Sequence, residues 1–358
     1  MRVVQIIDSL EAGGAERMAV NYANALVNKI AFSGLIATRK EGTLKNQIDS
    51  GVSYLFLGKK KSIDFRVIFK LRSYIKENKI DIIHAHSSSF FIAVLVKLTF
   101  PQIKIVWHDH YGSRANETRE KNKVLIFLSA FFSSILVVNL QLEEWSRKYM
   151  KCSRISFIPN FATSEKQTGK ITNLKGEDGK RIVFLANLKN PKNHILVLKS
   201  FSDLELYKFG WSLHLIGRDY EDSYSKTLKD FITSKSLQEY IHLYGAKEDV
   251  KFILSQASIG ILASTEEGFP VTLLEYALAN LAVISTNVGY CSTVIQNNSN
   301  GLLFNPLSDK QINNQLKKIT EDNSLVNVLA ANFKKSVLAN YSEEIIIEQL
   351  ILAYQNSK

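Results

Sequence analysis

The sequence predicts an α/β protein with two doubly wound domains, each built on a parallel sheet. Short apolar runs rich in β-branched residues alternate with helical patterns along the chain, which is typical of sheets whose parallel strands are joined by helices. The 358 residues exceed the size at which a single core usually keeps growing. Hydrophobic residues make up 46% of the sequence, which is enough for two large cores.

The expected strands are apolar runs of a few residues, each bounded by polar residues or glycine. The polar stretch 161–180 has no periodic apolar face, so we expect it to link a first domain, 1–165, to a second domain, 178–340. A last amphipathic stretch, 342–354, is expected to be helical. The strands are predicted at residues 3–7, 34–38, 80–84, 104–108, 135–139, 155–158, 182–186, 212–217, 241–244, 259–263 and 282–286.

The chain start and the apolar runs bear on the compartment. Met1 is followed within two residues by a strand-like run, so we expect no secretory leader and a cytoplasmic protein. The longest apolar runs, 90–100 and 124–138, are shorter than the ~20 residues that span a bilayer. They are expected to be buried helices, or a helix followed by a strand, with a monotopic membrane contact as the alternative. Cys152 and Cys291 lie in different domains, which favours neither a disulfide framework nor a zinc site.

The positive charge lies mainly in the first domain. Residues 1–165 carry 24 Lys and Arg against 14 Asp and Glu, whereas 166–358 carry 21 against 20. Much of the excess falls in 59–61 and in the helix-like stretch that follows. Such a face suits anionic lipids, each basic group being worth about 1 kcal/mol near a membrane surface, and a solvated helix face is the alternative. No recognised motif for DNA or RNA accompanies the charge, so no nucleic-acid partner is expected.

Two glutamates eight positions apart mark a strand-to-helix junction. The run 257–263 is expected to be a buried strand, so Glu267 lies in the loop at its carboxyl end. Gly268 allows close approach of the backbone to a ligand, and Pro270 suits the first turn of a helix. The free N–H groups of that helix suit a diphosphate, to which the dipole contributes about 0.3–1 kcal/mol. Glu275, about one turn further, can reach a ribose hydroxyl pair, although the spacing alone also fits a solvated helix start.

The segment 264–277, with the phrase 279–289 that follows it, resembles the Glu-x7-Glu signature of retaining GT-B glycosyltransferases of family 4, also called glycosyl transferases group 1. The resemblance implies the GT-B fold, with two Rossmann-like domains and a cleft between them. It implies an acceptor-side first domain completed by the C-terminal helix 341–358, and a donor-binding second domain. In the second domain the implied donor contacts are Gly268, Phe269, Pro270, Val271 and Glu275, and Glu267 is implied to face the donor sugar.

In the first domain, the resemblance implies a phosphate-facing loop at Gly13 and Gly14, which precede a helical pattern. A plain turn before a helix is the alternative. Two His-x-His pairs follow predicted strands, His84 with His86 and His108 with His110. His110 best matches the family histidine that reaches the donor sugar. A core or supporting role is the alternative for the other three histidines and is favoured for His84. A metal centre is the less favoured alternative, so no metal site is predicted.

Lys192 matches the family lysine that neutralises charge on the leaving diphosphate. The usual arginine is absent, and Asn187 stands in its place with a hydrogen-bonding group but no charge. Lys189 lies close enough in sequence to compensate. No Asp-x-Asp motif is present, which agrees with metal-independent transfer.

The sequence therefore predicts a hexosyltransferase that moves a sugar, with retention, from a nucleotide-sugar donor to a glycan or lipid-linked acceptor in cell-surface polysaccharide biosynthesis. The donor is expected to be a UDP-sugar, with a GDP-sugar as the alternative, and no separate cofactor is expected. Peripheral attachment to the inner face of the membrane is expected through the basic first domain. The alternatives are a non-catalytic GT-B subunit of a glycan assembly complex, a nucleotide-sugar epimerase or phosphorylase, and a metal-dependent hydrolase that uses the histidine pairs.

Overall fold

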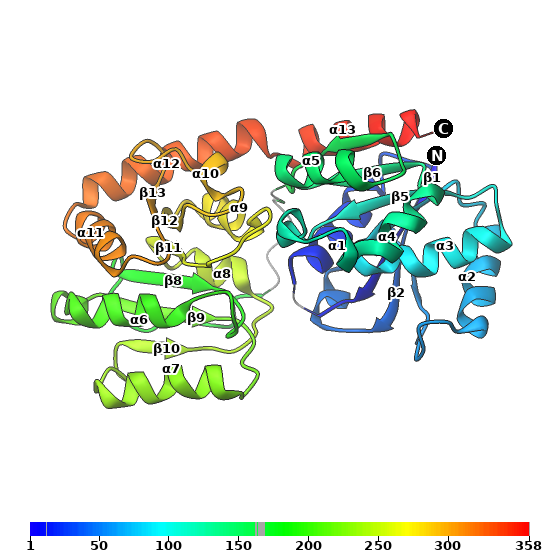
Figure 1. Ribbon diagram of the computed structural model, residues 1–358. Coiled ribbons are helices and arrows are strands. Elements are labelled where there is room, and N and C mark those ends of the chain that lie inside the picture. Colours follow the sequence, from blue (N-terminus) through cyan, green and yellow to red (C-terminus); the bar gives the residue numbers. More distant parts are fainter. Residues whose placement is uncertain (12, 162, 164–168, 358) are drawn as a thin grey trace. The chain divides into compact units, whose positions relative to one another are not determined.

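The computed structural model describes residues 1–11, 13–161, 163 and 169–357. The chain divides into two compact α/β units (Figure 1). Unit 1 comprises Met1–Asn160 and Glu343–Lys358, and unit 2 comprises Phe161–Ser342. Of the predicted linker 161–180, residues 162 and 164–168 lie outside the described part of the chain.

Unit 1 contains a seven-stranded sheet in the order β3-β2-β1-β4-β5-β6-β7, with every pairing parallel. The six strands predicted for this part of the chain are confirmed. The edge strand β3 was missed; it has only four residues, and all four are half-buried. The strands are β1 (Arg2–Ser9), β2 (Phe32–Lys40), β3 (Ser53–Phe56), β4 (Ile82–His86), β5 (Lys104–Asp109), β6 (Ser134–Val137) and β7 (Ile155–Phe157).

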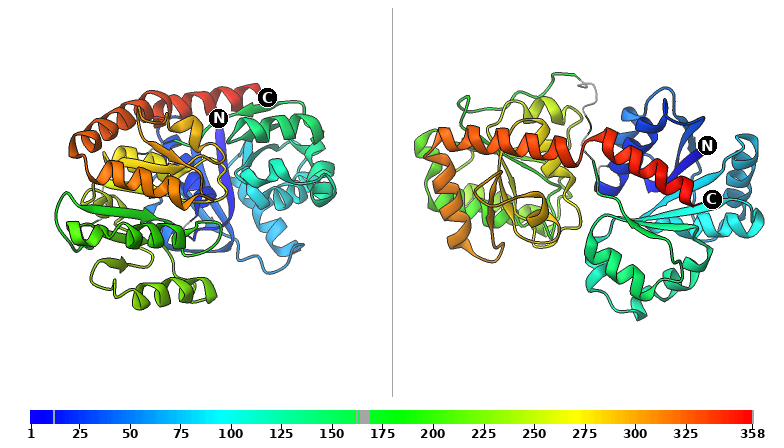
Figure 2. Two further views of the ribbon diagram at one scale, coloured as in Figure 1. Left: turned by 60° about the vertical axis from the view of Figure 1, so that its left-hand side comes forward. Right: turned by 90° about the horizontal axis from the view of Figure 1, so that it is seen from above.

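Helices cover the sheet of unit 1, and the C-terminal helix α13 packs beside α1. Both chain ends lie close together in the views of Figures 1 and 2. The apolar run 90–100 forms α3, and 124–138 forms α4 followed by β6, as predicted. No helix in the described part of the chain is both long and apolar enough to cross a bilayer. The helices are α1 (Gly14–Leu26), α2 (Phe65–Glu77), α3 (Phe90–Thr99), α4 (Lys123–Leu128), α5 (Leu140–Tyr149) and α13 (Glu343–Asn356).

Unit 2 contains a six-stranded parallel sheet in the order β10-β9-β8-β11-β12-β13. Five strands were predicted, and the short edge strand β13 was missed. The strands are β8 (Arg181–Leu185), β9 (Ser212–Ile216), β10 (Ile241–Leu243), β11 (Ile259–Leu262), β12 (Ala282–Thr286) and β13 (Leu302–Phe304). The helices are α6 (His194–Asp203), α7 (Ser223–Ser234), α8 (Val250–Leu254), α9 (Val271–Leu278), α10 (Cys291–Val294), α11 (Asp309–Thr320) and α12 (Asn323–Asn340).

Strand order brings residues that are distant in sequence to one edge of each sheet. In unit 1, β1, β4 and β5 are neighbours, and in unit 2, β8, β11 and β12 are neighbours. Because all these strands are parallel, their carboxyl ends meet at the same edge, where ligands bind in open α/β sheets. The predicted site residues follow the ends of these central strands.

Candidate active site

The loops after β8 and β11 bring the two predicted catalytic groups of unit 2 together. Lys192 Nζ donates to Glu267 Oε1 at 2.7 Å, and Ser264 Oγ donates to the same oxygen at 2.7 Å. The Glu267 side chain is 11% exposed and that of Lys192 is 28% exposed. Glu267 Oε2 bonds to no residue within the described ranges. The pair therefore leaves one carboxylate oxygen and part of an ammonium group for a ligand.

Backbone contacts hold the Glu267 loop in place. Thr265 N donates to Pro191 O at 2.9 Å, which fastens the loop to the Lys192 segment. On its other side, Tyr290 N donates to Gly268 O at 3.2 Å. Gly289 has a φ of 56°, and a Cβ there would lie 1.9 Å from the Glu267 carbonyl oxygen. Only glycine allows the turn after β12 to support the Glu267 loop this closely.

Helix α9 begins directly after this loop. It starts at Val271, so Pro270 is its N-cap rather than a residue of its first turn as predicted. Phe269 is buried, with its ring centroid 5.2 Å from that of Tyr290. Glu275 lies half-buried one turn into the helix. The α9 start, Glu267 and Glu275 thus belong to one continuous strand-loop-helix segment, as the sequence predicted.

Tyr276 anchors α9 to the sheet. Its hydroxyl accepts from Leu185 N at 2.8 Å and donates to Ile261 O at 3.0 Å, so it links β8 and β11. The ring packs against Gly260, where an added Cβ would lie 2.5 Å from it. Burial raises the pKa of this hydroxyl. The residue beside Glu275 therefore fixes the helix, which in turn sets the position of Glu275.

Asn187 follows β8, and its Oδ1 accepts from Arg218 N at 2.9 Å. Arg218 is exposed and lies directly after β9, with its guanidinium 4.9 Å from the Tyr220 ring centroid. Lys189 Nζ lies 5.8 Å from the same ring. Sequence analysis missed Arg218 as a candidate, although its place after a predicted strand end was a usable signal. The structure thus brings the backbone of Arg218 to the asparagine that stands where the family arginine is expected, and both cations lie near the Tyr220 ring.

In unit 1, the four histidines after β4 and β5 form one cluster. His84, His86 and His108 are fully buried, and His110 is half-buried. His86 Nδ1 lies 2.9 Å from His110 Nε2, and His84 Nε2 lies 3.2 Å from His108 Nδ1. Burial lowers the pKa of His110 to about 3, and lowers the other three pKa values well below the ordinary range, with the neighbouring histidines adding to the effect. All four rings are therefore neutral at ordinary pH.

The possibility of a metal centre can be tested on this geometry. One ring nitrogen each from His84, His86 and His108 lies within 4.8 Å of the others. However, both nitrogens of His84 and of His86 are already engaged in hydrogen bonds. The His84 and His86 rings are also stacked, at 26° and 4.3 Å, so their in-plane lone pairs do not converge on one point. The cluster fits a hydrogen-bond network better than a metal site.

The loop carrying His110 is fixed from the opposite face of β5. Asp109 is fully buried and accepts from Arg114 Nε at 2.6 Å and from Tyr111 N at 3.1 Å. Burial raises the pKa of this carboxyl, and the Arg114 guanidinium acts against that shift. Because successive strand residues alternate between faces, the carboxylate points away from the histidine cluster.

Gly13 and Gly14 lie at the start of α1. Gly13 is the N-cap of the helix, and Arg17 N donates to its carbonyl at 2.9 Å. A Cβ on Gly14 would meet no atom within 4 Å. Beside this loop, Asp8 at the end of β1 bonds to Ser88 Oγ at 2.6 Å and to the Thr38 hydroxyl. Asp8 is a further candidate that sequence analysis did not single out.

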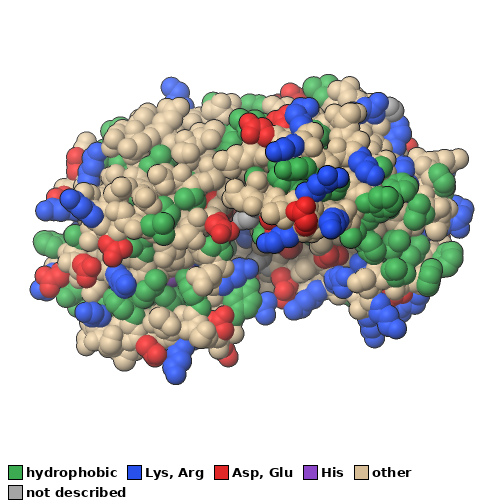
Figure 3. All heavy atoms as spheres, viewed as in Figure 1, with side chains coloured by type: hydrophobic (Ala, Val, Ile, Leu, Met, Phe, Trp, Pro, Cys, Tyr) green, Lys and Arg blue, Asp and Glu red, His purple; other side chains and the backbone are tan. Residues whose placement is uncertain are grey.

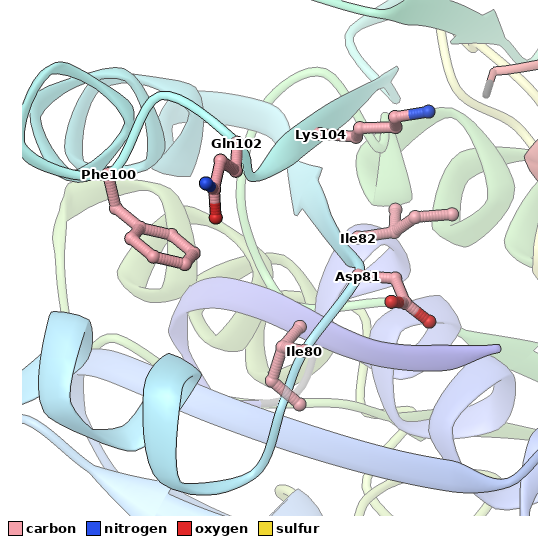
Figure 4. A pocket seen from close by; sticks show the side chains of 6 residues that line it. All are labelled: Ile80, Asp81, Ile82, Phe100, Gln102 and Lys104. Atoms are coloured by element: carbon pink, nitrogen blue, oxygen red, sulfur yellow. The ribbon is translucent and has the colours of Figure 1, made fainter.

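A small hollow of about 280 Å³ lies at the other edge of the unit 1 sheet (Figure 4). It adjoins the amino ends of β4 and β5, and is lined by Ile80, Asp81, Ile82, Phe100, Gln102 and Lys104. The catalytic candidates all follow carboxyl ends of strands. The hollow therefore does not belong to the candidate site.

Comparison with known sequences supports the family. The family described as "Glycosyltransferase Family 4" matches residues 12–166, and that described as "Glycosyl transferases group 1" matches residues 165–336. The two matches are contiguous and span both units. The chain belongs to the glycosyltransferases of the family 4 type. The resemblance to that family is thereby confirmed at the level of a family 4 type glycosyltransferase.

Relatives and solved structures agree with this assignment. The glycosyltransferase is 24% identical over 356 residues to a UDP-Gal:alpha-D-GlcNAc-diphosphoundecaprenol alpha-1,3-galactosyltransferase from Escherichia coli, covering 92% of this chain and 90% of the relative. It is 24% identical to an undecaprenol-linked alpha-1,4-N-acetyl-D-galactosaminyltransferase from Campylobacter jejuni, covering 94% and 93%. Among solved structures, HepE from Anabaena in complex with UDP and glucose matches with a TM-score of 0.82, at 16% identity and 99% coverage of both chains. The predicted GT-B fold is confirmed.

Proposed function

We propose that this glycosyltransferase moves a sugar from a nucleotide-sugar to a glycan or lipid-linked acceptor, with retention and without a metal ion, in cell-surface polysaccharide biosynthesis. The observation that carries the proposal is the Lys192–Glu267 pair at the carboxyl edge of the unit 2 sheet, at the start of α9. It combines a cation, a partly free carboxylate and the N–H groups of a helix start. These groups suit a charged diphosphate joined to a neutral sugar.

Each group has one role in the proposed reaction. Lys192 and the N–H groups of α9 stabilise the negative charge that grows on the departing diphosphate, with Lys189 and Arg218 adding positive charge near Asn187. Glu275 accepts from the ribose hydroxyls, and Glu267 accepts from hydroxyls of the donor sugar. His110, as the family resemblance implies, contacts the donor sugar. The bond from the anomeric carbon to the phosphate oxygen breaks, and a bond to the acceptor oxygen forms on the same face. The acceptor proton passes to the departing phosphate oxygen.

The relatives support the substrate classes. Two of them are named for acceptors linked to undecaprenol through a diphosphate, and a relative from Escherichia coli is named for O-antigen biosynthesis. The structural neighbour HepE holds UDP and glucose. We therefore propose a UDP-sugar donor before a GDP-sugar donor, and a polyprenol-linked acceptor.

A surface of unit 1 suits the membrane on which such an acceptor resides. On α2, Phe65 and Phe69 lie one turn apart with 71% and 56% of their surface exposed, and Arg66 and Lys70 follow them directly. Figure 3 shows hydrophobic side chains interspersed with Lys and Arg over this unit. Aromatic and basic side chains together suit the interface of an anionic bilayer. We propose peripheral attachment at the cytoplasmic face, and co-sedimentation with anionic but not neutral vesicles tests it.

Calorimetric titration of UDP, GDP and ADP, with and without EDTA, tests the donor site. We expect UDP to bind best, and EDTA to have no effect. Glu275→Ala should weaken binding by about tenfold or more, because a hydrogen bond to a charged group contributes about 1.5–3 kcal/mol. Glu239→Ala, which removes an exposed carboxylate elsewhere in unit 2, is the matched control. Binding that is indifferent to Glu275 would remove the donor-site assignment.

Transfer assays separate catalysis from binding alone. We expect Lys192→Ala to abolish donor hydrolysis and transfer, while Lys199→Ala, on the exposed side of α6, leaves both unchanged. The replacement of the family arginine by Asn187 favours one second candidate, a non-catalytic subunit of a glycan assembly complex. That candidate predicts UDP binding without turnover in the wild type.

A further inference from the structure

Six polar side chains in the core of unit 1 form one connected hydrogen-bond network. Gln5 pairs with His84 across β1 and β4, and His86 pairs with His108 across β4 and β5, so these side chains share one face of the sheet. Helix α13 packs over that face and contributes Tyr354, which is fully buried. The network consists of Gln5, His84, His86, His108, His110 and Tyr354.

The network has two arms that meet at Tyr354. In the first arm, Gln5 Nε2 lies 3.3 Å from Tyr354 Oη, Gln5 Oε1 lies 2.8 Å from His86 Nε2, and His86 Nδ1 lies 2.9 Å from His110 Nε2. In the second arm, Tyr354 Oη lies 2.6 Å from His84 Nδ1, and His84 Nε2 lies 3.2 Å from His108 Nδ1. His110 therefore connects to the C-terminal helix through two intervening side chains.

The Gln5 amide fixes the proton positions of the first arm. Each neutral imidazole carries one N–H, and an amide oxygen can only accept. Because Gln5 Oε1 faces His86 Nε2, that nitrogen carries the proton and His86 Nδ1 is bare. The bare Nδ1 accepts from Nε2–H of His110, which leaves Nδ1 of His110 bare as well.

The second arm follows by the same reasoning. Gln5 Nε2 donates to Tyr354 Oη, so the Tyr354 proton goes to His84 Nδ1. His84 then donates from Nε2 to His108 Nδ1, and His108 carries its proton on Nε2. The two ends of the network, His110 Nδ1 and His108 Nε2, are the cluster's ring nitrogens without a hydrogen-bond partner in the described part of the chain. One end is an acceptor and the other is a donor.

We propose that Tyr354 and Gln5 are positioning residues for His110: through His86 they hold its ring in the Nε2–H form, so that the bare Nδ1 accepts a hydrogen bond from a substrate hydroxyl. This inference rests on the proposed function for the role of His110, but not for the proton arrangement itself. A bare nitrogen can only accept, so it takes the proton of a sugar hydroxyl and suits the positive charge that develops near the anomeric carbon, whereas an N–H would donate to the hydroxyl oxygen and repel that charge. Tyr354, which lies near the C-terminus, thus helps to determine whether His110 Nδ1 accepts or donates a hydrogen bond.

The geometry allows only one concerted alternative. If the Gln5 amide turned over, its NH₂ would donate to His86, and every proton in both arms would move to the other ring nitrogen. All four histidines would then carry Nδ1–H, and His110 would become a donor at Nδ1. In that form Tyr354 would donate to Gln5 and accept from Nδ1–H of His84, so the orientation of the Gln5 amide against Tyr354 decides between the two forms. Burial raises the pKa of Tyr354, which keeps its proton in place.

Nitrogen NMR of histidine-labelled protein tests the arrangement without substrate. Long-range proton–nitrogen correlations report which ring nitrogen carries the proton. We expect all four cluster histidines in the Nε2–H form in the wild type, and a mixture of forms at His86 and His110 in Tyr354→Phe. Nδ1–H at His86 or His110 in the wild type would overturn the proposal, as would a Tyr354→Phe spectrum identical to that of the wild type. If Tyr354→Phe fails to fold, the wild-type spectrum alone decides.

Kinetics test the consequence for transfer. We expect Tyr354→Phe to lower kcat by about tenfold with KM for the donor nearly unchanged, since the bond is made to a group that acts in the transition state. Ser357→Ala is the matched control, because it removes another buried hydroxyl of the α13 segment, bonded to Ser134 Oγ at 2.8 Å, outside the network. Equal losses in both variants would indicate loosened helix docking and refute a positioning role. Expected tautomers with unchanged kcat in His110→Ala would instead refute the role of His110 in the proposed function.

Discussion

Acidification should destabilise unit 1 more than unit 2, through the four buried histidines of unit 1. Their pKa values in the folded chain lie well below 6.5, the ordinary value, that of His110 being about 3. The unfolded chain therefore binds more protons than the folded chain below pH 6.5. The stability that these neutral rings contribute is fully present above pH 6.5 and is lost as the pH falls.

The magnitude follows from the unfolded state alone. At pH 5.5, one unit below the unfolded pKa, each histidine that stays neutral when folded costs about 1.4 kcal/mol, and four cost about 6 kcal/mol. This figure does not depend on how far the folded pKa values are lowered, provided they stay below about 5. Tyr22 of α1 and Tyr354 of α13 face the cluster, and burial raises their pKa values, so neither adds charge in this range. The loss is comparable with the whole stability of an ordinary domain, about 5–15 kcal/mol.

Urea unfolding followed by tryptophan fluorescence measures this loss. Trp107 and Trp145 lie in unit 1 and Trp211 in unit 2, so Trp211→Phe leaves a signal from unit 1 alone. With a slope of about 2–3 kcal/mol per M, the midpoint should fall by about 2–3 M between pH 7.5 and pH 5.5. Unit 2 holds three histidines with lowered pKa values, the fully buried His194 and His214 and the half-buried His242. The signal of unit 2 should therefore show about half to three quarters of the loss. If the unfolding free energy of unit 1 fell by less than about 1.4 kcal/mol, the contribution of a single histidine, the reasoning would be refuted.

Two further changes test the supports of the donor site. Gly289→Ala should reduce UDP binding at least tenfold and lower the unfolding free energy by more than the about 1–3 kcal/mol that backbone strain at a positive φ costs, because the new Cβ also meets the Glu267 carbonyl. Gly245→Ala, at a positive φ of 70° in open space, carries the backbone strain alone and is the control; equal effects would contradict the close-approach argument. Tyr276→Phe should lower the unfolding free energy by about 1–3 kcal/mol, because it leaves Leu185 N without its partner; thermal unfolding measures the change. Tyr240→Phe, at the surface, should cost little. A similar cost in both variants would count against the anchoring role of Tyr276.

Much of the fold could be predicted because central strands of parallel sheets are apolar throughout. Sequences such as 182–186 and 282–286 carry this signal strongly, and both become buried strands. The edge strands β3 and β13 were missed, whereas the equally short edge strands β7 and β10 were predicted. Short edge strands are specified by their neighbours in the sheet more than by their own periodicity.

The residues of the candidate site could be predicted from the sequence, but the contacts between them could not. The segment containing Glu267 carried both a local pattern and a family resemblance, and its place after β11 agrees with the structure. The ion pair with Lys192 joins residues 75 positions apart, and no local pattern encodes such a contact. The histidine pairs were visible as strand-end residues, but their link to Tyr354 spans 270 positions and depends on how α13 docks. Sequence periodicity predicts which face a residue occupies, whereas partners depend on packing.

The two groups of candidate residues solve different electrostatic problems. In unit 2, the Glu267 carboxylate is held against the Lys192 ammonium at 2.7 Å, which suits a ligand that carries charge of its own. In unit 1, the histidines share their face with an amide and a phenol, and the one carboxylate within their sequence run, Asp109, points to the other face and pairs with Arg114. With no acidic partner, these imidazoles stay neutral, and a neutral ring distinguishes donors from acceptors only by where its proton lies. The charged pair of unit 2 therefore suits a charged ligand group, and the neutral histidines of unit 1 suit an uncharged one.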